Sequence, residues 1–176
     1  VRSAIKDTID WPCKVTHLYR TAHLCAKESI SASITWFFEQ EPEGIILEDD
    51  CLVDTTFFYF AQQCLERYRT DTRIMQIGAS NFQYGRKWGD DSYYFSRYNH
   101  IWGWAGWKRA WQHFDLAMTF THKQQLSKSL ESVFERVQDR TYWKAMLNYI
   151  NSGNLDTWDY QWMFAMWYRN GMSIIP

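Results

Sequence analysis

The stretch "EGIILEDDCLV", residues 43–53, decides how the rest of the chain is interpreted. A short aliphatic run ends in three consecutive carboxylates, Glu48, Asp49 and Asp50, and apolar residues follow at once. Adjacent like charges repel, so this arrangement at the tip of a buried strand is unfavourable unless a cation neutralises it. Mg²⁺ and Mn²⁺ bind one or two carboxylates together with phosphate oxygens of a substrate. The stretch therefore predicts a metal–diphosphate site, and the structural alternative is a charged turn before a helix capped by Asp54.

The composition excludes several classes of protein. The chain has 176 residues, 46% of them hydrophobic, which suffices for the core of a single domain. With 19 basic and 20 acidic residues it lacks the basic excess of a nucleic-acid-binding protein. No signal peptide opens it and no apolar run approaches the roughly 18 residues of a membrane span, so we expect a cytoplasmic protein. Peripheral membrane association stays open.

Aromatic residues are unusually frequent, with 11 Trp, 11 Tyr and 11 Phe making up 19% of the chain. Such a tryptophan-rich composition suits a protein that handles flat, half-apolar ligands such as sugar faces, although burial is the commoner use of any single Trp. The four cysteines form no C-x-x-C pair and no zinc-like cluster. We expect small buried thiols, with Cys51 and Cys64 packed in the core and not joined in a disulfide.

Strands and helices alternate along the chain, which predicts a layered α/β fold. Strands are expected at 14–19, 45–47, 73–80, 92–98 and 172–176, and helices at 29–40, 55–70, 105–114, 123–151 (a pair split near Asp139) and 158–171. No repeat or linker divides them, so we expect one domain over residues 1–176. In such sheets ligands bind beyond the carboxyl ends of the strands, where the three carboxylates lie.

Residues 44–83, "GIILEDDCLVDTTFFYFAQQCLERYRTDTRIMQIGASNFQ", resemble the acidic-motif segment of GT-A-fold glycosyltransferases. The nearest likeness is to bacterial relatives of the N-acetylglucosaminyltransferase I type, which carry an E-D-D form of the D-x-D motif. The resemblance continues through "YYFSRYNHIWGWAGWKRAW" (93–111) to "WDYQWMFAMWYRNGMSIIP" (158–176), and so covers most of the chain from about Trp11. It implies a Rossmann-related mixed sheet flanked by helices.

The resemblance also implies roles for individual residues. Asp50, the last acid of the motif, becomes the metal ligand, while Asp49 and Glu48 become nucleotide contacts. The tryptophan–aspartate pair of that family matches Trp158 and Asp159, which makes Asp159 the base that takes the acceptor proton. For Asp159 the structural alternative is a helix N-cap.

The stretch "IWGWAGW", residues 101–107, places small residues between large flat ones. Gly103 permits close approach of the backbone to a ligand, and Trp102 and Trp104 are candidate walls of a sugar site. The alternative is aromatic core at a strand–helix junction. His100, just before this stretch, is a candidate ligand or base, although a structural histidine is the commoner case.

Two features depart from the family pattern. Relatives carry an Arg and then Asn-Leu-Gly-Cys before the first helix, whereas this chain has Arg20, a possible nucleotide contact, and then Cys25 in place of the glycine. Relatives also begin with a strand and turn that hold the nucleotide base, and they continue beyond Pro176. The chain is therefore expected to be a GT-A domain truncated at its N-terminal end. Truncation at the C-terminal end stays open.

Three functional hypotheses follow. The first is a metal-dependent inverting glycosyltransferase-like domain, which uses Mn²⁺ or Mg²⁺, a nucleotide-diphospho-sugar donor and a glycan or other hydroxyl acceptor. The second is a non-catalytic carbohydrate- or nucleotide-binding remnant, because the base-binding wall is missing. The third, a glycoside hydrolase with two carboxylates, fits less well because tandem acids at one strand end suit a metal better. Homo-oligomerisation, which would cover an exposed sheet edge, stays open.

Overall fold

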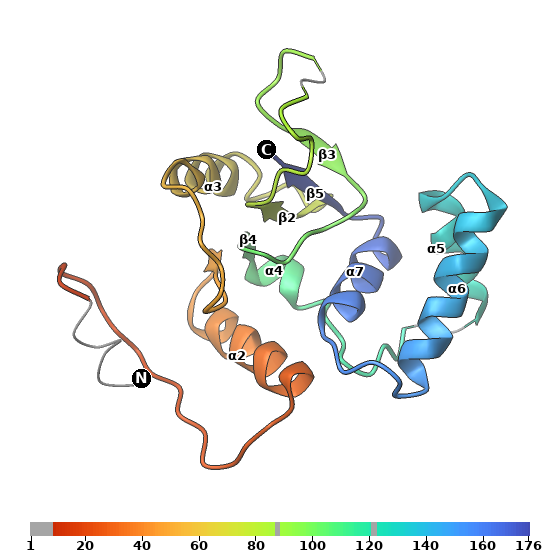
Figure 1. Cartoon of the computed structure of the whole chain (residues 1–176), viewed down its shortest axis with the longest axis horizontal. Helices are drawn as coiled ribbons and strands as arrows, with labels where there is room; N and C mark the ends of the chain where they lie inside the picture. The colour runs from red at the N-terminus through yellow and green to blue at the C-terminus, as the bar shows by residue number, and fades with distance from the viewer. Residues whose placement is uncertain (1–8, 87–88, 121–122) are drawn as a thin grey trace.

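The structure is a computed structural model that describes residues 9–86, 89–120 and 123–176 (Figure 1). It has a mixed α/β fold with a five-stranded sheet flanked by helices. The elements are α2 (Ala26–Gln40), β1 (Glu43–Ile46), α3 (Thr56–Arg67), β2 (Ile74–Gly78), β3 (Tyr94–Ser96), β4 (Trp104–Trp107), α4 (Lys108–Trp111), α5 (Lys123–Val133), α6 (Val137–Asn151), α7 (Asp159–Tyr168) and β5 (Met172–Ile175). None of the helices in these ranges is long and apolar enough to cross a membrane.

The strand order in the sheet is β1-β4-β2-β5-β3. Strand β4 is antiparallel to both β1 and β2, β2 is parallel to β5, and β3 is antiparallel to β5. Strands β1, β2 and β5 therefore run in one direction. Their carboxyl ends meet at the same edge of the sheet, where β4 begins.

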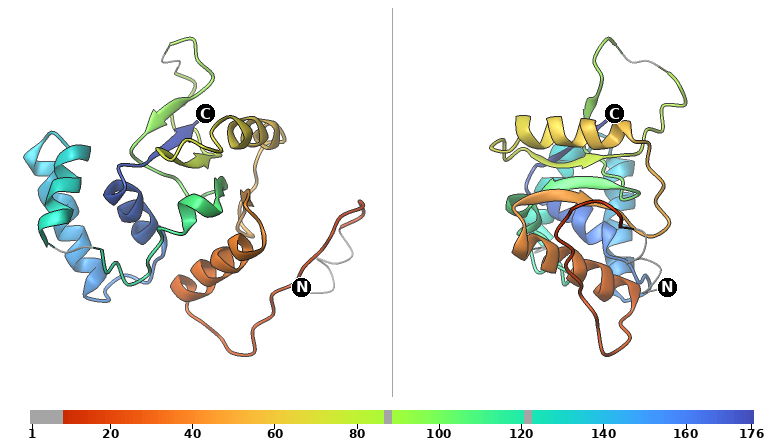
Figure 2. Two further views of the ribbon diagram at one scale, coloured as in Figure 1. Left: turned by 180° about the vertical axis from the view of Figure 1, so that it is seen from behind. Right: turned by 90° about the vertical axis from the view of Figure 1, so that its left-hand side faces the viewer.

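Helices cover both faces of the sheet, as the edge-on view on the right of Figure 2 shows. Helix α3 packs on one face, where its buried side chains Phe57, Ala61 and Cys64 meet Ile77 and Ile174 of the sheet. Helices α2, α4 and α7 cover the other face through an aromatic cluster. The core is thus divided between the two faces of the sheet.

Helices α5 and α6 form a hairpin that packs on α7 and not on the sheet (Figure 1). Buried residues of the hairpin, Leu130, Leu147 and Ile150, join Phe164 and Trp167 of α7 in a third apolar cluster. Helix α7 therefore has one side toward the sheet and another toward the hairpin, which explains why it is apolar nearly all round.

Two of the expected elements are wrong. Residues 14–19 form no strand and are mostly exposed, because no neighbouring strand pairs with them among the described residues. The start of the expected helix at 105–114 belongs instead to β4, and only Lys108–Trp111 are helical. The small residues Ala105 and Gly106 sit in the middle of the sheet, paired on both sides by β1 and β2.

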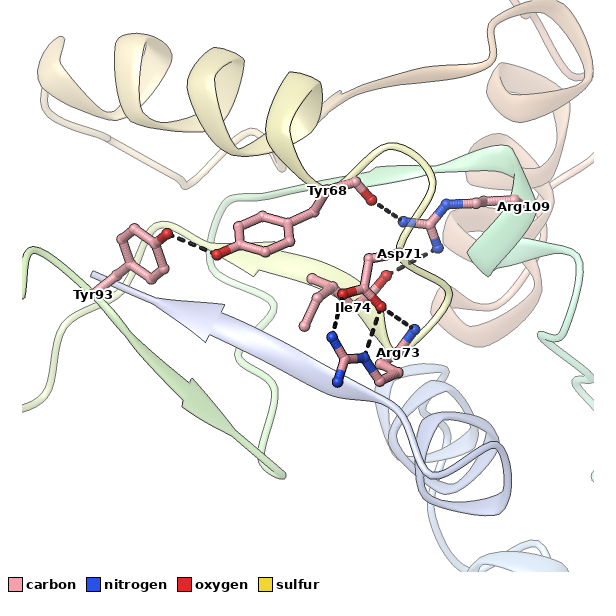
Figure 3. A network of polar contacts seen from close by, with 6 residues as sticks. All are labelled: Tyr68, Asp71, Arg73, Ile74, Tyr93 and Arg109. Carbon is pink, nitrogen blue, oxygen red and sulfur yellow. Dashed lines mark hydrogen bonds and ion pairs between the residues drawn. The ribbon is translucent and has the colours of Figure 1, made fainter.

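An arginine from α4 fastens the turn between α3 and β2 (Figure 3). The guanidinium of Arg109 donates hydrogen bonds to the carbonyl oxygens of Tyr68 (2.7 Å), Arg69 (2.7 Å) and Ile74 (2.9 Å). In the same turn Asp71 forms an ion pair with Arg73 at 2.7 Å. This cluster lies at the end of the sheet opposite to the carboxyl ends of β1 and β2.

Candidate functional site

The acidic loop, residues 47–53, follows β1 and packs against Gly103 at the start of β4. Gly103 has φ 76°, a conformation that favours glycine. A Cβ atom at this position would lie 2.9 Å from Val53 Cγ1 and 3.2 Å from Leu47 Cδ2. The groups that approach Gly103 closely in the structure are Val53 and Leu47, the two apolar ends of the acidic loop, and Ala79 after β2.

The three carboxylates of this loop differ in exposure. Glu48 is half-buried, whereas Asp49 and Asp50 are exposed. Burial raises the pKa of Glu48, and the charges of Asp50, Asp159 and Asp49 raise it further, in that order of effect. A bound cation would relieve this repulsion.

Asp159 is the first residue of α7 and is more than 100 positions from the acidic loop in the sequence, yet its charge acts on Glu48. The structure therefore brings the two predicted acidic elements to one region. Burial raises the pKa of Asp159, against the opposing effect of its own backbone N–H and that of Tyr160. The hydroxyl of Thr157 donates a hydrogen bond to Asp159 Oδ1. The carboxylate thus lies at the start of α7, and its pKa is above that of an ordinary aspartate.

A hollow of about 390 Å³ lies between α2 and the acidic loop. Its walls include Ser29 and Ser33 from α2 and the loop residues Glu48 and Asp49. Arg20 donates hydrogen bonds to Ser29 O (3.3 Å) and Ser33 Oγ (3.2 Å), so its guanidinium lies beside the α2 wall of this hollow. Cys25 is exposed immediately before α2.

The three tryptophans predicted to bind the nucleotide sugar, Trp102, Trp104 and Trp158, have different environments. Trp102 is 57% exposed, whereas Trp104 is 1% and Trp158 is 3% exposed. Trp104 and Trp158 pack together in the core between the sheet and α7, with ring centroids 6.4 Å apart. Because neither has a surface to offer a ligand in this structure, we leave both out of the proposed site.

Two residues near the site carry no motif that would have singled them out. Gln76 is fully buried in β2; its Nε2 donates to His100 O (2.7 Å) and its Oε1 accepts from Trp162 Nε1 (2.7 Å). Phe82, in the loop after β2, contacts the rings of His100 and Trp102. A single glutamine within the apolar run "IMQIG" was the available signal for Gln76, since a buried amide needs partners.

The carboxylates of the acidic loop could hold a divalent cation only if phosphate oxygens of a substrate diphosphate also bound it. Among residues 9–86, 89–120 and 123–176, no three His, Cys, Asp or Glu side chains are close enough together to hold a metal ion. A metal that also binds substrate phosphates needs just one or two protein carboxylates. Asp50 and Asp49 are exposed and meet that smaller requirement.

Comparison with protein-family models, curated proteins and solved structures finds no match to this chain. The likeness to GT-A glycosyltransferases therefore depends on the sequence motifs themselves. What the structure adds is a mixed sheet flanked by helices, with the motif residues at one edge.

Proposed function

We propose that this chain is a metal-dependent inverting glycosyltransferase-like domain of the GT-A type, which transfers a sugar from a nucleotide-diphospho-sugar donor to an acceptor hydroxyl. The observation that carries the proposal is the hollow of about 390 Å³ beside the carboxyl end of β1, which Glu48 and Asp49 of the acidic loop line. The charge of Asp159, which raises the pKa of Glu48, supports it. The acidic loop and the hollow thus lie at the carboxyl end of a strand, where α/β sheets bind ligands.

The donor would lie in the hollow between α2 and the acidic loop. Asp50 would hold Mn²⁺ or Mg²⁺, with Asp49 beside it, and the cation would offset negative charge on the leaving diphosphate. Glu48 lines the hollow and is available to a ribose hydroxyl. Arg20, at the α2 wall, supplies a cation for the nucleotide or its phosphates.

Asp159 would take the proton from the acceptor hydroxyl as that oxygen attacks the anomeric carbon. A general base works best when its pKa approaches the working pH, and burial shifts Asp159 in that direction. The hydrogen bonds from Thr157 and from the start of α7 keep the carboxylate in one orientation. No covalent intermediate is needed, so the configuration at the anomeric carbon inverts.

Titration calorimetry with UDP and Mn²⁺ tests the donor half of the proposal. The wild-type protein should bind UDP only weakly without Mn²⁺, and Asp50→Ala should lose the Mn²⁺-dependent part of the affinity. Asp156→Ala is the matched control, because this exposed aspartate lies three residues before α7 and outside the hollow. Equal Mn²⁺-dependent UDP affinity in wild type and Asp50→Ala would overturn the proposal.

A non-catalytic carbohydrate-binding domain is the second candidate. The exposed rings of Phe82 and Trp102 favour it, since they offer apolar faces without requiring turnover. A wild-type protein that binds sugars but consumes no nucleotide sugar with Mn²⁺ would decide for this candidate.

A further inference from the structure

Three aromatic rings form an exposed platform beside the acidic loop: Phe82, His100 and Trp102. The Phe82 ring stands edge-on to His100 (centroids 4.7 Å apart, 72°) and to Trp102 (5.7 Å, 78°). His100 and Trp102 are nearly parallel, at 13° and 6.2 Å. Phe82 is 43% and Trp102 57% exposed, so broad ring surface faces solvent in a fixed arrangement.

The backbone of this platform is fastened to both acidic elements. Gly103, next to Trp102, packs against Val53 and Leu47 at the two ends of the acidic loop. On the other side, Gln76 joins the carbonyl of His100 to the indole of Trp162, which lies in the first turn of α7 after Asp159. The segment between β3 and β4 that carries His100 and Trp102 is therefore in contact with the acidic loop and, through Gln76, with the helix of the proposed base.

The chemistry of the platform suits an uncharged ring. It contains no carboxylate, lysine or arginine, and burial lowers the pKa of His100, which favours the neutral form of its imidazole. Apolar surface gathered at a functional edge marks a binding surface. A pyranose ring is the natural occupant, since it offers a face of C–H groups to the aromatic rings and hydroxyls to solvent and to the imidazole.

We infer that Phe82, His100 and Trp102 form the acceptor subsite, which takes a pyranoside with a continuous C–H face. This inference rests on the proposed function and changes the expected role of Trp102 from donor contact to acceptor contact. The donor hollow is lined by α2 and β1, whereas the platform is joined through Gln76 to the helix of Asp159. One buried side chain, Gln76, thus links the platform to the helix that carries the proposed base.

The test measures saccharide and nucleotide binding separately. Chitotriose, cellotriose and lactose are titrated into wild type, Phe82→Ala, Trp102→Ala and Trp102→Phe, and saturation-transfer NMR identifies which sugar protons touch the protein. Trp11→Ala is the matched control, because Trp11 is 60% exposed but lies in the N-terminal segment. UDP–Mn²⁺ affinity and the urea midpoint are recorded for every variant.

We expect at least one saccharide to bind wild type, with affinity reduced about tenfold or more in Trp102→Ala and Phe82→Ala, the equivalent of about 1.4 kcal/mol. Trp102→Phe should recover part of it, and Trp11→Ala should match wild type. All variants should keep UDP–Mn²⁺ affinity, since the platform is separate from the donor hollow.

Three results would overturn the inference: no saccharide binds wild type, saccharide affinity survives in Trp102→Ala, or Trp102→Ala loses UDP affinity in place of saccharide affinity. The last result would return Trp102 to the nucleotide. If wild type fails to bind UDP–Mn²⁺ but binds a saccharide through Trp102, the proposed donor chemistry fails while the sugar subsite stands.

Discussion

Asp159 is the first residue of α7, after the N-cap residue Trp158, and its carboxylate interacts with the backbone N–H groups of Asp159 and Tyr160. One substitution separates this structural role from that of the proposed base. In Asp159→Asn the amide oxygen still accepts hydrogen bonds from the helix start, so the fold should hold. The amide cannot take a proton, so sugar transfer should slow by about 10²–10⁴-fold while UDP–Mn²⁺ affinity stays unchanged. Single-turnover rates and calorimetry measure the two effects.

Asp50→Asn provides the contrast, because it should weaken Mn²⁺-dependent UDP binding together with the rate. Asp156→Asn should alter neither. If Asp159→Asn lowers the urea midpoint while transfer continues at the wild-type rate, the carboxylate is a cap only and the base lies elsewhere.

Cysteine reactivity should follow exposure and pKa. Cys64 is buried, as the sequence predicts, and burial raises its pKa to about 11; Cys51 is only half-buried, while Cys13 and Cys25 are exposed, contrary to the expectation of buried thiols. All four thiols are free. Because the thiolate is the reactive form, native protein at pH 8 should label quickly at Cys13 and Cys25 and only after unfolding at Cys64.

Mass spectrometry of proteins alkylated with and without urea identifies the sites, and Cys64→Ala confirms which peptide carries the protected thiol. Labelling of Cys64 at the rate of Cys25 in the native protein would contradict the packing of α3 on the sheet.

Among the elements, the turn between α3 and β2 should depend most on Arg109. Arg109→Ala leaves three carbonyl groups, two of them partly buried, without their charged donor, so we expect a loss of about 2–3 kcal/mol in the free energy of unfolding. Arg109→Lys should recover less than half, because lysine lacks the planar fork that reaches several acceptors. Urea denaturation measures both.

Arg73→Ala is the matched control in the same turn. Its ion pair with Asp71 is exposed, and such pairs contribute about 1 kcal/mol or less. An equal decrease in the free energy of unfolding for Arg73→Ala and Arg109→Ala would show that the turn tolerates loss of the Arg109 hydrogen bonds.

Local sequence patterns predict the long helices and four of the five strands of the sheet. Helix α2 begins three residues before its expected start and ends where expected, and Asp54 accepts a hydrogen bond from the first backbone N–H of α3, as the capping pattern predicts. Strand β4 was missed because "AGWKRAW" is rich in helix-compatible residues. Pairing with β1 and β2 overrides that preference, and pairing depends on residues far away in the chain.

For the molecule as a whole, Gln76 of β2 connects the sheet to α7 and to the segment that carries His100 and Trp102. In Gln76→Met the shape is nearly conserved, but His100 O and Trp162 Nε1 lose their partner. Two buried polar groups without hydrogen bonds should cost about 3 kcal/mol in the free energy of unfolding, measured by urea denaturation.

Gln161→Met offers a matched control in α7. Gln161 is also fully buried, yet its amide has no hydrogen-bond partner among the described residues. Its replacement should therefore be neutral or stabilising within about 1 kcal/mol. Equal destabilisation by the two substitutions would indicate that the Gln76 bonds contribute little.

The candidate site could be predicted from the sequence only in part. The run Glu48–Asp50 is a local pattern, and its position at a strand end follows from the aliphatic residues before it. The link to Asp159 came from a family resemblance, since no local pattern reports a contact across 100 residues. Burial of Trp104 and Trp158 depends on how α7 packs on the sheet, which the order of residues does not specify.

The position of Gly103 between the acidic loop and Trp102 has a thermodynamic consequence. A displacement of that loop when a cation and nucleotide bind should reach Trp102 through the chain, because a Cβ at Gly103 would lie only 2.9–3.2 Å from Val53, Ala79 and Leu47. Donor and acceptor should then bind cooperatively, and the coupling must be reciprocal: UDP–Mn²⁺ changes saccharide affinity by the same factor by which saccharide changes UDP affinity. In Gly103→Ala the added methyl group would press on Leu47, Val53 and Ala79. This substitution should change the coupling factor even where each separate affinity is retained.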